Sequence, residues 1–185
     1  MDQLEANEVN HKEKWLAISW APYSRRSAVF ASEIGGELYT IQYLRFKSPK
    51  HAPLKYFLQA LRTMQVLIKE RPGAIHVQMP PFVAGLVVDL YCRITGAKFV
   101  LDYHSAAFGS IWDWALPVQK YLARRAVANT VTNQHWAEII ESWQAKSIIL
   151  GDAFRDLPPG SDYPVSGKFN IAYICTYSAD EPLEE

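Results

Sequence analysis

Short apolar runs alternate with longer amphipathic stretches along most of the chain. A short run of aliphatic and aromatic residues is typical of a buried strand, whereas apolar residues at helical spacing are typical of a helix. The pattern predicts strands over 15–20, 37–42, 74–78, 99–101, 129–132, 147–150 and 169–175. It predicts helices over 25–34, 53–70, 82–95, 114–128 and 134–144. This alternation predicts an α/β fold, a three-layer Rossmann-like doubly wound parallel sheet with right-handed crossovers.

The long helix predicted over 53–70 combines an apolar stripe with a strong basic bias. Its apolar residues recur at helical spacing, which predicts a face packed on the core; they are Leu54, Phe57, Leu58, Leu61, Met64 and Ile68. From 45 to 71 the chain carries seven Lys and Arg residues against Glu70 alone, with aromatic residues interleaved. A basic stretch of this kind is either a solvated outer face or a dock for anionic lipid headgroups.

Polar residues follow directly after the apolar run over 99–101. Asp102 and His104 are two positions apart at the end of this strand, so their side chains are expected on the same side of the sheet. Ligands of open α/β sheets bind outside the carboxyl ends of the strands. A carboxylate beside a histidine could hold its ring for contact with a hydroxyl or a phosphate. The alternative is a strand-end pair that binds no ligand.

Three further segments are candidates for the same edge. Tyr23, Ser24, Arg25 and Arg26 form the first strand-to-helix turn, where backbone N–H groups and two guanidinium groups could bind a phosphate. The alternative is a solvated basic turn, with Ser24 as helix N-cap. Pro80 follows the strand over 74–78 and is expected to shape a loop at the cleft. Trp112, in the loop after His104, could stack on a sugar ring or pack at the entry of a helix, and His76 is expected in the core.

Composition and missing motifs exclude several classes of protein. Equal numbers of acidic and basic residues, 19 of each, give no drive toward nucleic acid. The sequence contains no glycine-rich dinucleotide motif, no P-loop and no nucleophile elbow, and its five histidines lack zinc spacing. Two cysteines without metal-ligand spacing indicate buried thiols in a reducing compartment. The polar N-terminus has no apolar signal core, so we expect a cytoplasmic protein, with membrane association as an option.

The predicted domain organisation has four parts. Residues 1–14 are a flexible N-terminal arm, and 15–157 form the Rossmann-like domain. Residues 158–167 are a linker by their Pro and Gly content. Residues 168–185 contain one strand without a following helix, which we interpret as the start of a truncated second domain.

Three segments together resemble the N-terminal half of GT-B glycosyltransferases that use nucleotide-sugar donors. They are A-I-H-V-Q-M-P-P (74–81), T-G-A-K-F-V-L-D-Y-H (95–104) and A-R-R-A-V-A-N-T-V-T-N-Q-H-W (123–136). The likeness spans roughly residues 15–157. In that family two Rossmann-like domains face each other across a cleft; the N-terminal domain binds the acceptor and the C-terminal domain binds the nucleotide-sugar. Residues 169–185 resemble the first strand of the donor domain.

The resemblance implies a hexosyltransferase that acts on a lipid-linked or saccharide acceptor. It places His104 beside the transferred sugar, the turn over 23–26 near the diphosphate, and the basic helix toward a membrane. The turn A-P-Y-S-R-R replaces the glycine-rich loop of many relatives, and the residues expected to bind the donor are absent. We therefore expect no cofactor in this fragment, little activity without a donor-binding domain, and an anionic membrane surface as a further partner.

Two other functions stay open at this point. The first is a non-enzymatic Rossmann-like module that docks a protein partner or an anionic membrane through its basic helix. The second is a small flavodoxin-like or other nucleotide-binding enzyme, which the absence of a phosphate-binding loop disfavours.

Overall fold

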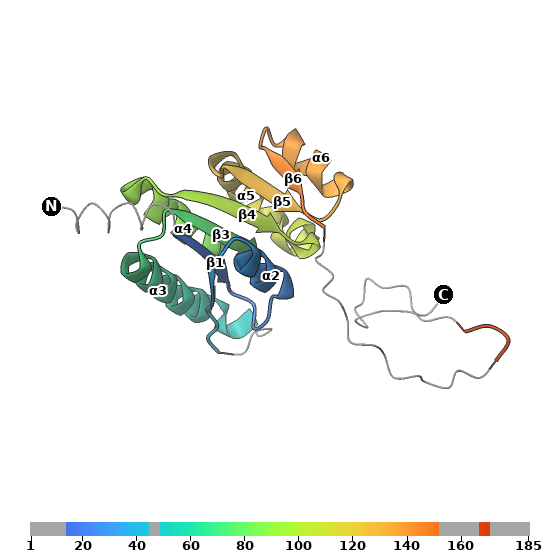
Figure 1. The fold of residues 1–185 in the computed structure, drawn as a ribbon, viewed down its shortest axis with the longest axis horizontal. Coiled ribbons are helices and arrows are strands. Elements are labelled where there is room, and N and C mark those ends of the chain that lie inside the picture. Colours follow the sequence, from blue (N-terminus) through green and yellow to red (C-terminus); the bar gives the residue numbers. More distant parts are fainter. Residues whose placement is uncertain (1–13, 45–48, 152–166, 171–185) are drawn as a thin grey trace. The chain divides into compact units, whose positions relative to one another are not determined.

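A computed structural model describes residues 14–44, 49–151 and 167–170 (Figure 1). The chain divides into two units, Met1–Ala153 and Phe154–Glu185, and every helix and strand described here belongs to the first. The strands are β1 (Trp15–Ser19), β2 (Glu37–Thr40), β3 (Ala74–Met79), β4 (Lys98–Tyr103), β5 (Ala128–Val131) and β6 (Ser147–Ile149). The helices are α2 (Arg25–Glu33), α3 (Ala52–Glu70), α4 (Phe82–Thr95), α5 (Leu116–Arg125) and α6 (Gln134–Ser142). Short 3-10 helices are η1 (Pro49–His51), η2 (Ser105–Phe108) and η3 (Ser110–Ala115).

The six strands form one parallel sheet in the order β2-β1-β3-β4-β5-β6. The chain therefore moves outward from β1 to β2, returns to β3 on the other side of β1, and continues in that direction to β6. The order of the strands reverses between β1 and β3. In doubly wound sheets this reversal opens a crevice at the carboxyl ends of the two strands, where ligands bind. The predicted fold class is confirmed.

Helices cover both faces of the sheet, but unequally (Figure 1). On one face α2 is the helix in contact, since its Phe30 stacks on His76 of β3. On the other face Thr63 of α3 accepts a hydrogen bond from Trp20, Gly85 of α4 approaches Met79, and α5 and α6 follow. This arrangement follows from right-handed crossovers. The connection from β1 to β2 crosses the sheet in the opposite direction to all later connections, so its helix, α2, lies on the opposite face. The face beside α2 therefore carries the polar side chains of the central strands.

Helix α3 packs on the sheet with the face opposite to the one predicted. Leu54, Phe57, Leu61 and Ile68 are exposed, so the prediction of a core-facing apolar stripe is wrong for them. The buried positions of α3 are instead Lys55, Gln59, Thr63, Val66 and Leu67. Hydrogen bonds satisfy part of this polar face: the Gln59 amide donates to the Ile41 carbonyl at 2.7 Å, and the Trp20 indole donates to Thr63 at 2.9 Å. Helical periodicity identifies an apolar stripe but not the side on which a partner lies.

The remaining boundaries of the described elements differ from the predictions by at most three residues, and 3-10 helices occupy the segment after β4. A helix was expected from residue 114, yet residues 110–115 form η3 and the α-helix begins at Leu116. Proline favours the first turn of a helix, and Pro117 occupies that position in α5. Gly96 ends α4 in the left-handed conformation with φ of 78°, which glycine adopts without the strain of a Cβ. Most of the arm predicted over 1–14, the linker predicted over 158–167 and the strand predicted over 169–175 lies outside the described residues.

Candidate functional site

A row of polar side chains crosses the central strands near their carboxyl ends, on the face that α2 covers. Gln78 of β3 is in register with Asp102 of β4, which is in register with Thr130 of β5. Ser19 of β1 donates a hydrogen bond to the Gln78 amide oxygen at 2.5 Å. All four residues are buried. Polar groups at this depth must be hydrogen-bonded, and the row contains two bonded pairs, Ser19 with Gln78 and Thr130 with Asp102.

Asp102 is the centre of this network. Its carboxylate accepts from the Arg26 guanidinium (Nε–Oδ1 2.8 Å) and from the Thr130 hydroxyl (Oγ1–Oδ1 2.7 Å). The second oxygen lies 3.2 Å from Nε2 of His104. The side chains of Arg26 and Asp102 are 7% and 0% exposed, so this is a buried ion pair. Asp102 thus joins the start of α2 to the carboxyl end of β4.

The electrostatic surroundings keep Asp102 ionised. Burial by itself raises the pKa of this carboxyl, but the hydrogen bond from His104 and the positive charges of His76, once protonated, and of Arg26 outweigh burial. The net effect lowers the pKa of Asp102 from 3.8 to about 2. A charged carboxylate is therefore fixed beneath His104 at neutral pH.

His104 lies at the carboxyl edge of the sheet with part of its ring in solvent. Its side chain is 31% exposed, and its backbone N–H donates to the Met79 carbonyl at 3.1 Å. The predicted pairing with Asp102 is confirmed as geometry. In the neutral ring, donation from Nε2–H to the carboxylate leaves Nδ1 as an acceptor. A hydroxyl group at this edge could then donate to His104, but its catalytic role and that of Asp102 stay predictions.

His76 belongs to the same face one layer deeper. Its ring is fully buried and stacks on Phe30 with centroids 3.9 Å apart. Neither ring nitrogen has a hydrogen-bond partner among the described residues. Burial is the main cause that lowers the pKa of His76 to about 4. The expected core placement is confirmed, and the ring is neutral at pH 7.

The turn before α2 separates into an exposed part and a buried part. Tyr23 is 75% exposed and Arg25 is also exposed, so both side chains face solvent near the carboxyl end of β1. Arg26 is directed inward and holds Asp102. A phosphate-binding role for these residues stays a prediction, and the observed partner of Arg26 is a carboxylate. Ser24 acts as the N-cap of α2, which was the alternative interpretation.

We expect Ser24→Ala to lower the free energy of unfolding by about 1 kcal/mol. The Ser24 hydroxyl accepts from the Ser27 N–H at 3.3 Å and donates to the Ser27 hydroxyl at 2.8 Å, and alanine removes both contacts. Ser24→Thr keeps the capping oxygen and serves as the matched control. Urea unfolding measures both variants; equal loss in the two would show that capping is not the cause.

A small aromatic cavity of about 100 Å³ lies at the reversal between β1 and β3, on the face that α3 covers. Pro80 and Trp112, both predicted at the site, line it. Its other lining residues are Trp20, Lys55, Tyr56, Gln59 and Pro81. The Lys55 ammonium lies over the Tyr56 ring, 4.9 Å from its centroid, and burial lowers the pKa of Lys55. Sequence reasoning missed Trp20 and Gln59, because their proximity to Trp112 depends on the packing of α3.

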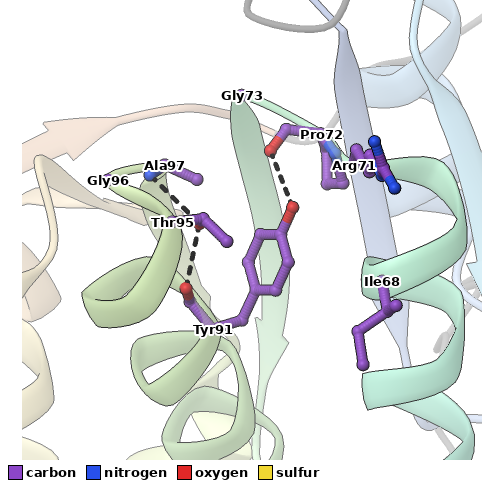
Figure 2. A pocket seen from close by; sticks show the side chains of 8 residues that line it. All are labelled: Ile68, Arg71, Pro72, Gly73, Tyr91, Thr95, Gly96 and Ala97. Atoms are coloured by element: carbon purple, nitrogen blue, oxygen red, sulfur yellow. Dashed lines mark hydrogen bonds between the residues drawn. The ribbon is translucent and has the colours of Figure 1, made fainter.

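A larger cavity, of about 560 Å³, lies away from this edge (Figure 2). Its lining comes from the C-terminal ends of α3 and α4 and from the residues that lead into β3 and β4. Tyr91 donates to the Pro72 carbonyl and Thr95 to the Tyr91 carbonyl, so most polar groups drawn in Figure 2 bond one another. This cavity is at the amino ends of the strands, opposite to the edge where ligands of such sheets bind.

Metal and thiol chemistry find no support in the described part of the chain. No group of three or more His, Cys, Asp or Glu residues that could hold a metal ion occurs among the described residues. Cys92 is a buried free thiol in α4, and burial raises its pKa to about 12. A thiol of this kind is inert. Cys175 lies outside the described residues.

Comparisons with known proteins identify the fold. No protein-family model and no curated protein matches the sequence. Among solved structures, Anabaena Alr3699/HepE in complex with UDP-glucose matches at a TM-score of 0.50 and 13% identity, over 76% of this chain. The same protein with UDP, and with UDP and glucose, matches at TM-scores of 0.47 and 0.48, with 14% and 13% identity. The match covers 44% of the HepE chain in the UDP-glucose complex, so the chain spans less than half the length of this protein.

The match to the UDP-glucose complex and the sheet together settle the fold, as the sequence resemblance implied. The parallel order of the strands and the helices on both faces agree with a Rossmann-like domain. The described domain therefore has the fold of part of a GT-B glycosyltransferase.

Proposed function

We propose that this chain is the acceptor-binding half of a glycosyltransferase that moves a sugar from a nucleotide-sugar donor to a lipid-linked or saccharide acceptor. The observation that carries the proposal is the Asp102–His104 pair at the carboxyl edge of β4, where the ring of His104 is part-exposed. HepE, which shares the fold, is bound to UDP-glucose in its structure. Binding of a donor to this protein is part of the proposal.

In this function the chain positions the acceptor. The Asp102 carboxylate holds His104 through Nε2, and the free acceptor position at Nδ1 receives a hydrogen bond from the acceptor hydroxyl. The aromatic cavity beside Trp112 and Pro80 holds the next part of the acceptor. Orientation of a bound hydroxyl toward the donor supplies much of the acceleration in transfers of this type. Stabilisation of the leaving diphosphate falls to a donor-binding domain, with Tyr23 and Arg25 at its border.

We expect His104→Ala to lower the rate of sugar transfer by about a hundredfold or more, because it removes the acceptor of the hydroxyl proton. The assay uses the protein that carries this domain together with its donor-binding domain, labelled nucleotide-sugars including UDP-glucose, and saccharide and lipid-linked acceptors. His135→Ala removes an exposed histidine of α6 and is the matched control. Unchanged transfer by His104→Ala, or no transfer and no calorimetric binding with any donor, would overturn the proposal.

Docking without catalysis is the second candidate function. The exposed apolar row of α3 favours it, since a purely solvated helix has no need of such a row. The same variant distinguishes the two functions: His104→Ala impairs a transferase, whereas a docking module keeps its binding.

A further inference from the structure

The outer surface of α3 and α4 exposes large apolar side chains in two rows. On α3 the row contains Leu54, Phe57, Leu61 and Ile68, of which Phe57 and Ile68 are 59% and 61% exposed. On α4 it contains Leu86, Leu90 and Ile94, and Ile94 is 75% exposed. Residues three to four positions apart share one side of a helix, which joins Leu86, Leu90 and Ile94 on α4 and Leu54, Phe57 and Leu61 on α3. Ile68 lies two turns further along the same side of α3. We call these seven side chains the apolar rows.

The two rows are neighbours. Helices α3 and α4 pack against each other, and Ile68 of α3 and Tyr91 and Thr95 of α4 line the same cavity (Figure 2). The rows therefore lie on adjacent helices, and the row of α3 reaches this cavity at Ile68. Soluble monomers rarely expose contiguous apolar patches of this kind, and a patch rimmed by polar residues marks an interaction site.

The rim of this surface is basic. From residue 50 to residue 95, all described, the exposed side chains include five Lys or Arg and no Asp or Glu. The basic residues are Lys50, Arg62, Lys69, Arg71 and Arg93. The two acids of this span are engaged: Glu70 with Lys14, and Asp89 with Arg93 and Arg125. Residues 50–95 carry six Lys or Arg against these two acids, so positive charge is in excess over this span.

We propose that the apolar rows and their basic rim dock on an anionic lipid bilayer, with α3 and α4 lying in the plane of the interface. Apolar side chains enter the boundary between headgroups and acyl chains, while Lys and Arg bind anionic headgroups. Charge argues against a second copy of this chain as occupant, because a two-fold interface would bring the basic rims together. No helix among the described residues is long and apolar enough to cross a bilayer, so this attachment is interfacial.

Docking in this orientation connects the membrane with the candidate site. Lys55 and Tyr56 in the first turns of α3, and Pro80 and Pro81 just before α4, line the aromatic cavity beside Trp112. Both docked helices thus begin next to that cavity. The bilayer is thus the partner of the side of the domain that binds the acceptor. Only the choice of a lipid-linked acceptor rests on the proposed function. Membrane binding itself does not depend on sugar transfer.

The test is sedimentation of the 185-residue chain with vesicles, without any nucleotide-sugar. We expect binding to vesicles of phosphatidylcholine with one-third phosphatidylglycerol, and much weaker binding to phosphatidylcholine alone. Arg62→Gln with Lys69→Gln should weaken the binding about thirtyfold, at ~1 kcal/mol for each basic residue. Phe57→Ser with Leu61→Ser should weaken it by about a hundredfold or more.

Matched controls keep composition and folding constant. Lys120→Gln with Lys146→Gln removes the same charge from α5 and the segment before β6, and Ile111→Ser with Phe169→Ser removes exposed apolar side chains elsewhere. Both controls should bind like the original chain, and circular dichroism confirms that every variant is folded. The proposal is overturned if the chain fails to bind anionic vesicles, if the rim and row variants bind as well as the controls, or if light scattering shows a dimer that the row variants dissociate. A failure of vesicle binding would not change the result expected for His104→Ala in the transfer assay, so the two proposals can fail separately.

Discussion

Asp102→Asn is expected to lower the free energy of unfolding by about 3–5 kcal/mol, the usual cost of removing one partner from a buried ion pair. The substitution keeps the shape of the side chain but removes its charge. Arg26, whose side chain is 7% exposed, then loses the carboxylate at 2.8 Å. Asparagine keeps one neutral oxygen, which can still accept from Thr130 at Oδ1, but the amide NH2 that replaces Oδ2 cannot accept from His104. Urea denaturation at pH 7 measures the change.

A double variant identifies the cause of this loss. Arg26→Met with Asp102→Leu replaces both charges by apolar side chains, and pairs replaced in this way often keep their stability. We expect the double variant to be more stable than Asp102→Asn alone. If the double variant is the less stable of the two, the ion pair stabilises the protein in its own right, and the loss of the carboxylate beside Arg26 is not the main cost.

The stability of the domain is expected to fall by roughly 3 kcal/mol between pH 6.5 and pH 4 because of His76. Burial lowers the pKa of His76 to about 4 in the folded state, against 6.5 for an ordinary histidine. Between these two values the unfolded chain binds a proton that the folded chain does not, so stability is lost as the pH falls. Asp102, with its pKa lowered to about 2, extends the loss below pH 3.8 by roughly 2 kcal/mol.

Unfolding by urea at a series of pH values tests this expectation. His76→Leu has similar volume and does not titrate, so it should remove most of the slope between pH 6.5 and pH 4 and retain stability at pH 7. His135→Gln is the matched control at an exposed position and should keep the slope. A slope that survives in His76→Leu would show that other groups cause the pH dependence.

The sequence by itself determined the order of the elements and one pair of the candidate site. Alternating apolar runs and amphipathic stretches predicted the parallel sheet, because local periodicity is set by which residues lie on one side of a strand or helix. The same periodicity placed Asp102 and His104 together, since both belong to one strand end. The cap at Ser24 was also present in the sequence, because a cap depends on residues close together in the chain.

Tertiary structure decided everything that depends on distant segments. Arg26 and Asp102 are 76 positions apart, and only the packing of α2 on the sheet makes them an ion pair. Gln59 and Thr63 lie on the buried side of α3 because they form hydrogen bonds with the Ile41 carbonyl after β2 and the Trp20 indole after β1. Phe57 and Leu61 are therefore on the exposed side of the helix. A helical stripe has the same pattern whether it faces a core or a bilayer, so the direction of α3 follows from its long-range partners.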